Sequence, residues 1–188
     1  MPPGGALFRA TTWGTAIALL CMIPYMRSMG RRAVMGDRAV LRAWWRVLIA
    51  WACLVAVGIA ISLAHGQFGG GGPTIQTKMV ESLATGGRET YGVAVTLLVT
   101  ALLVPIFEEL VFRGLILGGL TRHISFGWAN LLQAVLFAAI HADPPRFLFY
   151  LALGLLGGWL VKRSGSLAPA IALHALNNTL AISLRLMA

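Results

Sequence analysis

Six long apolar runs constrain the fold of this chain more than any other feature of its sequence. A helix that crosses the hydrocarbon core of a bilayer needs about 20 mostly apolar residues. Runs of this kind lie at about residues 7–26, 43–64, 91–120, 126–141, 147–161 and 167–185, of which the fourth and fifth are short. We therefore predict an all-α fold, a polytopic transmembrane helix bundle with about six membrane-spanning helices.

The composition agrees with a membrane environment. Of the 188 residues, 58% are hydrophobic and only 11% are charged, and the mean hydropathy is +0.80. A soluble domain typically has about 25% charged residues. The net charge of +9 could suit nucleic acid, but the basic residues lie mostly between the apolar runs, as the positive-inside rule expects. We expect a multi-pass integral membrane protein whose surroundings are a lipid bilayer, with no nucleic-acid partner.

The connections divide the chain into two parts. Residues 27–46 carry the strongest cytoplasmic signal, six arginines: Arg27, Arg31, Arg32, Arg38, Arg42 and Arg46. Residues 65–90 are polar and include the run Gly69 to Gly72, which predicts a flexible linker on the opposite side of the membrane. The chain is therefore predicted to consist of N-terminal anchoring helices with a Gly-rich linker, residues 1–90, and a core with the candidate chemistry, residues 91–188.

Two local patterns bear on helix geometry. The run 91–120 is too long for one perpendicular span, so we expect it to tilt, to bend near Pro105 or to continue as an interfacial helix. Small residues recur four apart, Gly114 with Gly118 and Gly154 with Gly158. This spacing is typical of helices that pack closely in lipid.

Three charged residues interrupt the third apolar run. Each central charge costs about 2.5–3.5 kcal/mol on insertion scales, so Glu108, Glu109 and Arg113 indicate a functional site. Glu109 and Arg113 stand in the i,i+4 order that favours a salt bridge, and we expect them to shape the site. Glu108 lies about 100° away around the helix and keeps a free carboxylate, which makes it the candidate general base.

Two histidines follow in later apolar runs. His141 ends the fourth run, with Phe137 one turn back on the same face, and by itself it fits a helix-end histidine as well as a catalytic one. His174 lies deep in the sixth run. Asn178 shares its helix face by i,i+4 spacing, so both side chains can point into one cavity.

A depth estimate indicates that these groups can meet. At about 1.5 Å rise per residue, Glu108 and His141 lie about 22 and 24 Å above a turn near residues 122–125. His174 and Asn178 lie about 15 and 20 Å above a turn near residues 162–166. If both turns lie on one side of the membrane, the four residues share a layer about 10 Å thick. The basic residues place both turns in the cytoplasm and the site toward the outer half of the bilayer.

The segments Glu108-Glu109-Leu-Val-Phe-Arg113, Phe137-Ala-Ala-Ile-His141 and His174-Ala-Leu-Asn-Asn178 resemble the three-motif signature of the CAAX prenyl protease and bacteriocin-processing (Abi) family. The resemblance covers roughly residues 91–185. It implies an intramembrane endopeptidase of the bacterial plasma membrane, with Glu108, His141, His174 and Asn178 as catalytic residues. Its substrate would be a peptide or protein in or at the membrane, cut near the C-terminus of a lipidated or membrane-associated chain. A protease of cytosolic lipidated proteins should open inward, in conflict with the charge count.

Two mechanisms fit these residues. In the favoured one no cofactor takes part: Glu108 activates a water, His141 orients it, and His174 with Asn178 stabilises the oxyanion. In the other, zinc is bound by Glu108, His141 and His174. Glu109 would then have to be the base, although it is placed to pair with Arg113.

Two other functions remain open on the sequence. A non-catalytic immunity or regulatory protein could keep the same fold and bind a peptide. A small proton-coupled transporter could use the same buried carboxylate, although about six helices without an evident repeat would make a small carrier.

Overall fold

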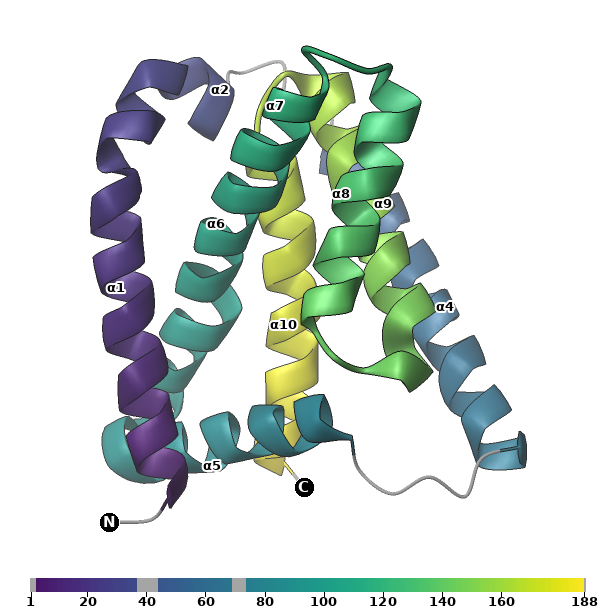
Figure 1. Cartoon of the computed structure of the whole chain (residues 1–188). Helices are drawn as coiled ribbons and strands as arrows, with labels where there is room; N and C mark the ends of the chain where they lie inside the picture. The colour runs from purple at the N-terminus through teal and green to yellow at the C-terminus, as the bar shows by residue number, and fades with distance from the viewer. Residues whose placement is uncertain (1–2, 37–43, 69–73, 188) are drawn as a thin grey trace.

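The predicted apolar runs all form helices. A computed structural model describes residues 3–36, 44–68 and 74–187, and no strand occurs among them. The runs become α1 (Pro3–Met29), α4 (Trp44–Phe68), the second half of α5 (Ile75–Leu97) with its continuation to Leu120, α8 (Phe126–Ile140), α9 (Phe147–Ser164) and α10 (Ala168–Met187). The all-α bundle is confirmed (Figure 1).

Four helical segments among the described residues are long and apolar enough to cross a membrane: Gly4–Met29, Trp44–Ala64, Gln76–Leu120 and Pro144–Ser164. Phe126–Ile140 is apolar but shorter. α10 is not among them, because His174, Asn177, Asn178 and Arg185 lower its hydropathy. The protein is thus a polytopic integral membrane protein with four such segments, and the number of about six spans stays a prediction.

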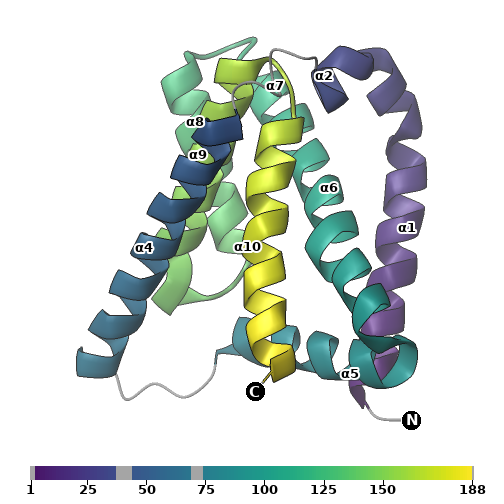
Figure 2. The same ribbon diagram turned by 180° about the vertical axis from the view of Figure 1, so that it is seen from behind.

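The two turns that the depth estimate required lie at the same end of the bundle. Figures 1 and 2 show the loop between α7 (Gly118–Leu120) and α8 beside the loop between α9 and α10. The short helix α2 (Arg31–Met35) is also at this end, because the Leu167 amide donates to the Ala33 carbonyl at 2.8 Å. α5 and the C-terminus of α10 lie at the opposite end.

The prediction of a flexible linker over residues 65–90 is wrong at both ends, because residues 65–68 belong to α4 and residues 75–90 to α5. Residues 75–91 form the first part of α5, and the run Gly69–Gly72 lies outside the described residues. Thr74 caps this helix, its hydroxyl accepting from the Thr77 amide at 3.1 Å. Figure 1 shows α5 lying across the end of the bundle.

The polar composition of α5 belongs to one face of an amphipathic helix. Lys78, Glu81 and Arg88 are exposed, whereas Leu83 and Ala84 are buried. An amphipathic surface helix separates polar and apolar residues in this way. Polar and glycine-rich composition therefore does not distinguish this helix from a linker.

The predicted bend of the third run lies at Gly92 rather than near Pro105. Gly92 has φ +80°, a left-handed conformation that suits glycine, and the chain turns there from the end of the bundle into its interior. Pro105 begins α6 (Val104–Glu109) between two π-helical segments, η1 (Leu98–Leu103) and η2 (Leu110–Leu117). The Val104 amide donates to the Val99 carbonyl, five residues back, so the ladder is already of π type when it reaches Pro105.

The glycine spacing predicts close helix packing, and the structure confirms this prediction for Gly154 and Gly158 in α9. A Cβ on Gly154 would lie 2.7 Å from the Ala134 Cβ, and one on Gly158 would lie 1.8 Å from the Asn130 Oδ1. Gly118 has no described atom within 4 Å of such a Cβ, so the pattern fails at that position. α8 and α9 therefore pack backbone to backbone, and the Gln133 amide adds a bond to the Gly154 carbonyl at 2.9 Å.

We expect Gly154→Ala to destabilise the protein. The added methyl group would meet the Cα of Ala134 at 2.8 Å, so the two helices must separate. Overpacking of this kind typically costs about 1–3 kcal/mol. Gly14→Ala on α1 is the matched control, because nothing lies within 4 Å of its Cβ position and alanine favours the helix. Thermal unfolding in detergent measures both, and equal melting of Gly154→Ala and wild type would contradict the packing.

Candidate active site

The salt bridge that the i,i+4 spacing predicts is formed at the centre of the bundle. The Glu109 Oε1 lies 2.8 Å from the Arg113 Nη1, and the two residues are only 0% and 2% exposed. The Arg113 Nη2 also donates to the Leu153 carbonyl at 3.2 Å, and its guanidinium lies 4.5 Å from the Phe137 ring centroid. The pair therefore ties η2 to α8 and α9.

Glu109 also holds a histidine from the last helix. Its Oε1 lies 2.9 Å from the Nδ1 of His174, which is 2% exposed. Because a carboxylate accepts, the proton of this bond belongs to Nδ1 of the imidazole. The Nε2 of His174 then faces the Glu108 Oε2 at 3.7 Å. Glu109 thus sets both the orientation and the tautomer of His174, a role that its sequence pairing with Arg113 does not reveal.

The Glu108 carboxylate is not hydrogen-bonded by the described residues, although it lies 3.7 Å from the His174 Nε2. Its Oε2 is buried and has no hydrogen-bond partner among the described residues, while 22% of the side chain is exposed. The neighbouring Glu109 is enclosed by Arg113 and His174. Two adjacent glutamates therefore have different surroundings: one is held by the protein and one faces the cavity.

His141 ends α8 beside an aromatic ring. Its Nδ1 lies 2.7 Å from the Phe137 carbonyl oxygen, which can only accept, so this nitrogen carries the proton and Nε2 is an acceptor. The imidazole stacks on the ring of Tyr150, with centroids 3.9 Å apart and planes inclined by 21°. The ring of Phe137 lies 4.7 Å away on centroids. The histidine is thus fixed in position by aromatic contacts from two helices.

Asn178 is partly committed to another helix. Its Nδ2 donates to the Thr100 carbonyl at 3.1 Å. A π pattern would give that carbonyl the amide of residue 105, but Pro105 has no N–H to donate. Asn178 therefore satisfies a carbonyl that the proline leaves unpaired. One N–H of its amide group remains for a ligand.

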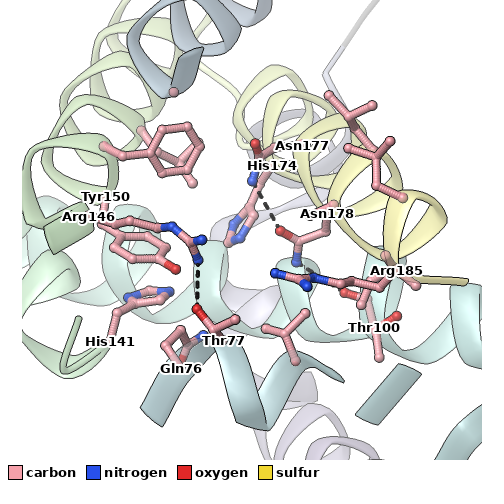
Figure 3. A pocket seen from close by; sticks show the side chains of 18 of the residues that line it. Gln76, Thr77, Thr100, His141, Arg146, Tyr150, His174, Asn177, Asn178 and Arg185 are labelled. Atoms are coloured by element: carbon pink, nitrogen blue, oxygen red, sulfur yellow. Dashed lines mark hydrogen bonds between the residues drawn. The ribbon is translucent and has the colours of Figure 1, made fainter. Parts of the chain in front are cut away.

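One cavity of about 920 Å³ gathers these groups (Figure 3). Glu108, His141, His174 and Asn178, the four residues predicted to meet, all line it. α4, α5 and the end of α10 supply most of its apolar wall: Val55, Ile59, Leu63, Met79, Val80, Leu83, Leu180 and Leu184. A cavity near the upper end of the usual range for ligand sites, about 300–1,000 Å³, can hold a short peptide segment.

Residues 90–180 match the family described as "Type II CAAX prenyl endopeptidase Rce1-like". This segment belongs to the CAAX prenyl protease family. The chain is also 28% identical over 150 residues to the Bacillus subtilis (strain 168) protein named "Putative membrane peptidase YdiL". That alignment covers 80% of this chain and 59% of the relative, so the chain spans less than two thirds of that protein's length. No solved structure matches the chain.

The CAAX protease segment contains every predicted site residue, but other parts of the chain complete its cavity. Thr77 of α5 and Arg185 of α10 lie on the cavity wall outside the matching residues. Sequence reasoning missed both, and it also missed Tyr150 and Thr100 inside the segment. Tyr150 has only its place at the start of the fifth apolar run as a signal, and Thr100 acts through its backbone carbonyl, which no side-chain pattern reveals.

The zinc alternative requires Glu108, His141 and His174 to converge on one ion. Among the residues that the structure describes, no group of three or more His, Cys, Asp or Glu side chains is arranged to hold a metal. Each imidazole uses Nδ1 within the protein, through the Phe137 carbonyl or through Glu109, and keeps Nε2. A zinc site would therefore need Glu108 and both Nε2 atoms to move together.

Proposed function

We propose that the protein is a metal-free intramembrane endopeptidase of the bacterial plasma membrane in which Glu108 activates the attacking water. Its substrate is a lipidated or membrane-associated peptide, cut near the C-terminus. One observation carries the proposal: the Glu108 carboxylate, whose Oε2 has no hydrogen-bond partner among the described residues, faces His174 at 3.7 Å in a cavity that His141 and Asn178 also line. Membership of residues 90–180 in the CAAX protease family supports it.

The first half of the reaction adds water to the peptide carbonyl. Glu108 takes one proton from the water as its oxygen attacks the carbonyl carbon. The unprotonated Nε2 of His141 accepts a hydrogen bond from the second O–H of the water and so orients it. The stacking of His141 on Tyr150 holds that nitrogen in place. The Glu108 carboxyl is then protonated, and negative charge develops on the former carbonyl oxygen.

The developing oxyanion needs donors on α10. Asn178 offers its remaining N–H. His174 offers Nε2–H only as an imidazolium, because Nδ1 already donates to Glu109. Glu109, which this step leaves ionised, lies 2.9 Å from the His174 Nδ1 as its counter-charge. When the intermediate collapses, the C–N bond breaks and the Glu108 carboxyl returns its proton to the leaving amine.

The test is a cleavage assay with purified full-length protein in nanodiscs. Membrane-associated and lipidated peptides are incubated with the protein, and products are identified by mass spectrometry. A product with a new C-terminus, absent with Glu108→Ala, supports the endopeptidase. Peptide binding without cleavage would favour an immunity or regulatory protein. Proton-coupled flux in liposomes without cleavage would favour a transporter.

Asn178→Ala should slow the chemical step by about 10²–10³-fold with little change in substrate binding, because one oxyanion donor is lost. It should also lower the melting temperature, because the Thr100 carbonyl loses its donor. Single-turnover kinetics, peptide affinity and thermal unfolding measure the three effects. Thr179→Ala is the matched control, since Thr179 is exposed on the same helix and does not line the cavity. A metal chelator should leave wild-type turnover unchanged. Stoichiometric zinc, with activity lost on chelation and restored by zinc, would instead make His141 and His174 metal ligands.

A further inference from the structure

One cation on the cavity wall has no role in the proposed reaction. Arg185 lies in the last turn of α10 and lines the same cavity as Glu108. Among the described residues its guanidinium has no hydrogen-bond or ion-pair partner. A guanidinium carries five N–H donors in a fixed planar arrangement and cannot lose its charge in a protein. Such a group at a largely apolar cavity is suited to an anionic ligand.

The other charges on the cavity wall are already accounted for. The Arg146 Nη1 donates to the Thr77 hydroxyl at 3.1 Å and lies 3.7 Å from the buried Asp143 carboxylate. Glu108 faces His174. Arg185 is therefore the charged group of the wall that the described residues leave without a counter-charge.

The position of Arg185 relates it to the bond that would be cut. It stands seven residues after Asn178, so both lie on the same helix face, with their Cα atoms about 10 Å apart along the axis. Side chains on a helix lean toward its N-terminus. Figure 3 shows Arg185 extending from α10 toward the middle of the cavity.

An extended peptide advances about 3.3–3.6 Å per residue. If the scissile carbonyl of such a substrate lies at Asn178, the first to third residues beyond that bond come within reach of Arg185. The α5 end of the cavity therefore fits a short leaving fragment that ends in a negative charge.

We propose that Arg185 is a specificity residue that binds the C-terminal carboxylate of the substrate, one to three residues beyond the bond that is cut. The inference rests on the proposed endopeptidase function and names the residue that recognises the end of the substrate. Guanidinium and carboxylate can pair through two parallel N–H···O bonds. Arg185 lies five residues beyond the segment that matches the family, so that match gives it no role.

The experiment measures binding without turnover. Glu108→Gln protein in nanodiscs of neutral lipid is titrated with two probes, an S-prenylated cysteine followed by three aliphatic residues with either a free C-terminal carboxylate or a C-terminal amide. The acid should bind about 10- to 100-fold more tightly than the amide, the range expected for hydrogen bonds between charged groups. Adding Arg185→Gln should lower the affinity for the acid to that for the amide, and it should leave the affinity for the amide unchanged.

Arg163→Gln is the matched control. It removes one charge from the last turn of α9, at the end of the bundle opposite Arg185, and Arg163 does not line the cavity. It should keep the preference for the acid. Equal affinity for both probes, no binding of the acid, or a preference that survives Arg185→Gln overturns the inference. So does a preference that disappears when phosphatidylglycerol is added, since Arg185 would then bind lipid phosphate. Failure of the proposed function is seen separately, as absent cleavage by protein that retains Glu108.

Discussion

Glu108→Gln is expected to abolish turnover while the protein keeps its fold and its melting temperature. The amide has nearly the shape of the carboxylate, but it can neither take a proton from water nor return one to the leaving amine. Removing a general acid–base group typically costs about 10²–10⁴-fold, and here one group performs both transfers. The Glu108 Oε2 makes no hydrogen bond among the described residues, so the substitution breaks no such bond there.

Two matched variants make this result specific. Glu81→Gln on the exposed face of α5 removes the same charge and should retain full activity. Glu109→Gln changes the adjacent residue and should lower stability as well, because its carboxylate holds both Arg113 and His174. Product formation by mass spectrometry and thermal unfolding in detergent are measured on the same preparations. Cleavage by Glu108→Gln at the wild-type rate would show that Glu108 is not the base.

Arg113→Ala is expected to give the largest loss of stability. It leaves the Glu109 carboxylate unpaired in a fully buried position and removes the donor to the Leu153 carbonyl. Breaking one side of a buried ion pair typically costs about 3–5 kcal/mol. For a chain of this size that corresponds to a fall of about 6–20 °C in melting temperature.

The comparison for this variant is Arg122→Ala, which removes an exposed arginine in the turn after α7. It should melt close to wild type. Arg113→Lys should fall between the two, because an ammonium can pair with Glu109 but lacks the fork that also reaches α9. Unchanged melting of Arg113→Ala in detergent would mean that the pair contributes no stability.

The sequence predicts contacts that depend on local spacing and misses those between distant helices. The Glu109–Arg113 bridge follows from i,i+4 geometry, and the shared cavity follows from helix rise along two hairpins. The bond from Glu109 to His174 joins residues 65 apart, and that from Asn178 to Thr100 joins residues 78 apart. Side-chain rotation and helix tilt decide such bonds, and neither can be read from residue spacing.

α5 shows a different limit. Its first half contains Gly86 and Gly87, which resemble linker residues by composition. In the structure they are packing positions: a Cβ on Gly86 would collide with the backbone of Gly4, and one on Gly87 would lie 2.7 Å from the Phe8 ring. Composition alone cannot separate a glycine that gives freedom from one that allows close approach, because the difference lies in the partner helix.

Pro105 has a consequence for the relative height of two helices in the bilayer. The Thr100 carbonyl lacks a backbone donor at that proline and receives one from Asn178 on α10. If α10 slid by one turn, about 5.4 Å, the Thr100 carbonyl would lose the amide group that now donates to it. Pro105 and Asn178 together therefore fix the height of α10 relative to η1 and α6, which follow one another along the chain. This fixed height keeps Glu108 level with His174. Neither Pro105 nor Asn178 activates the water in the proposed mechanism.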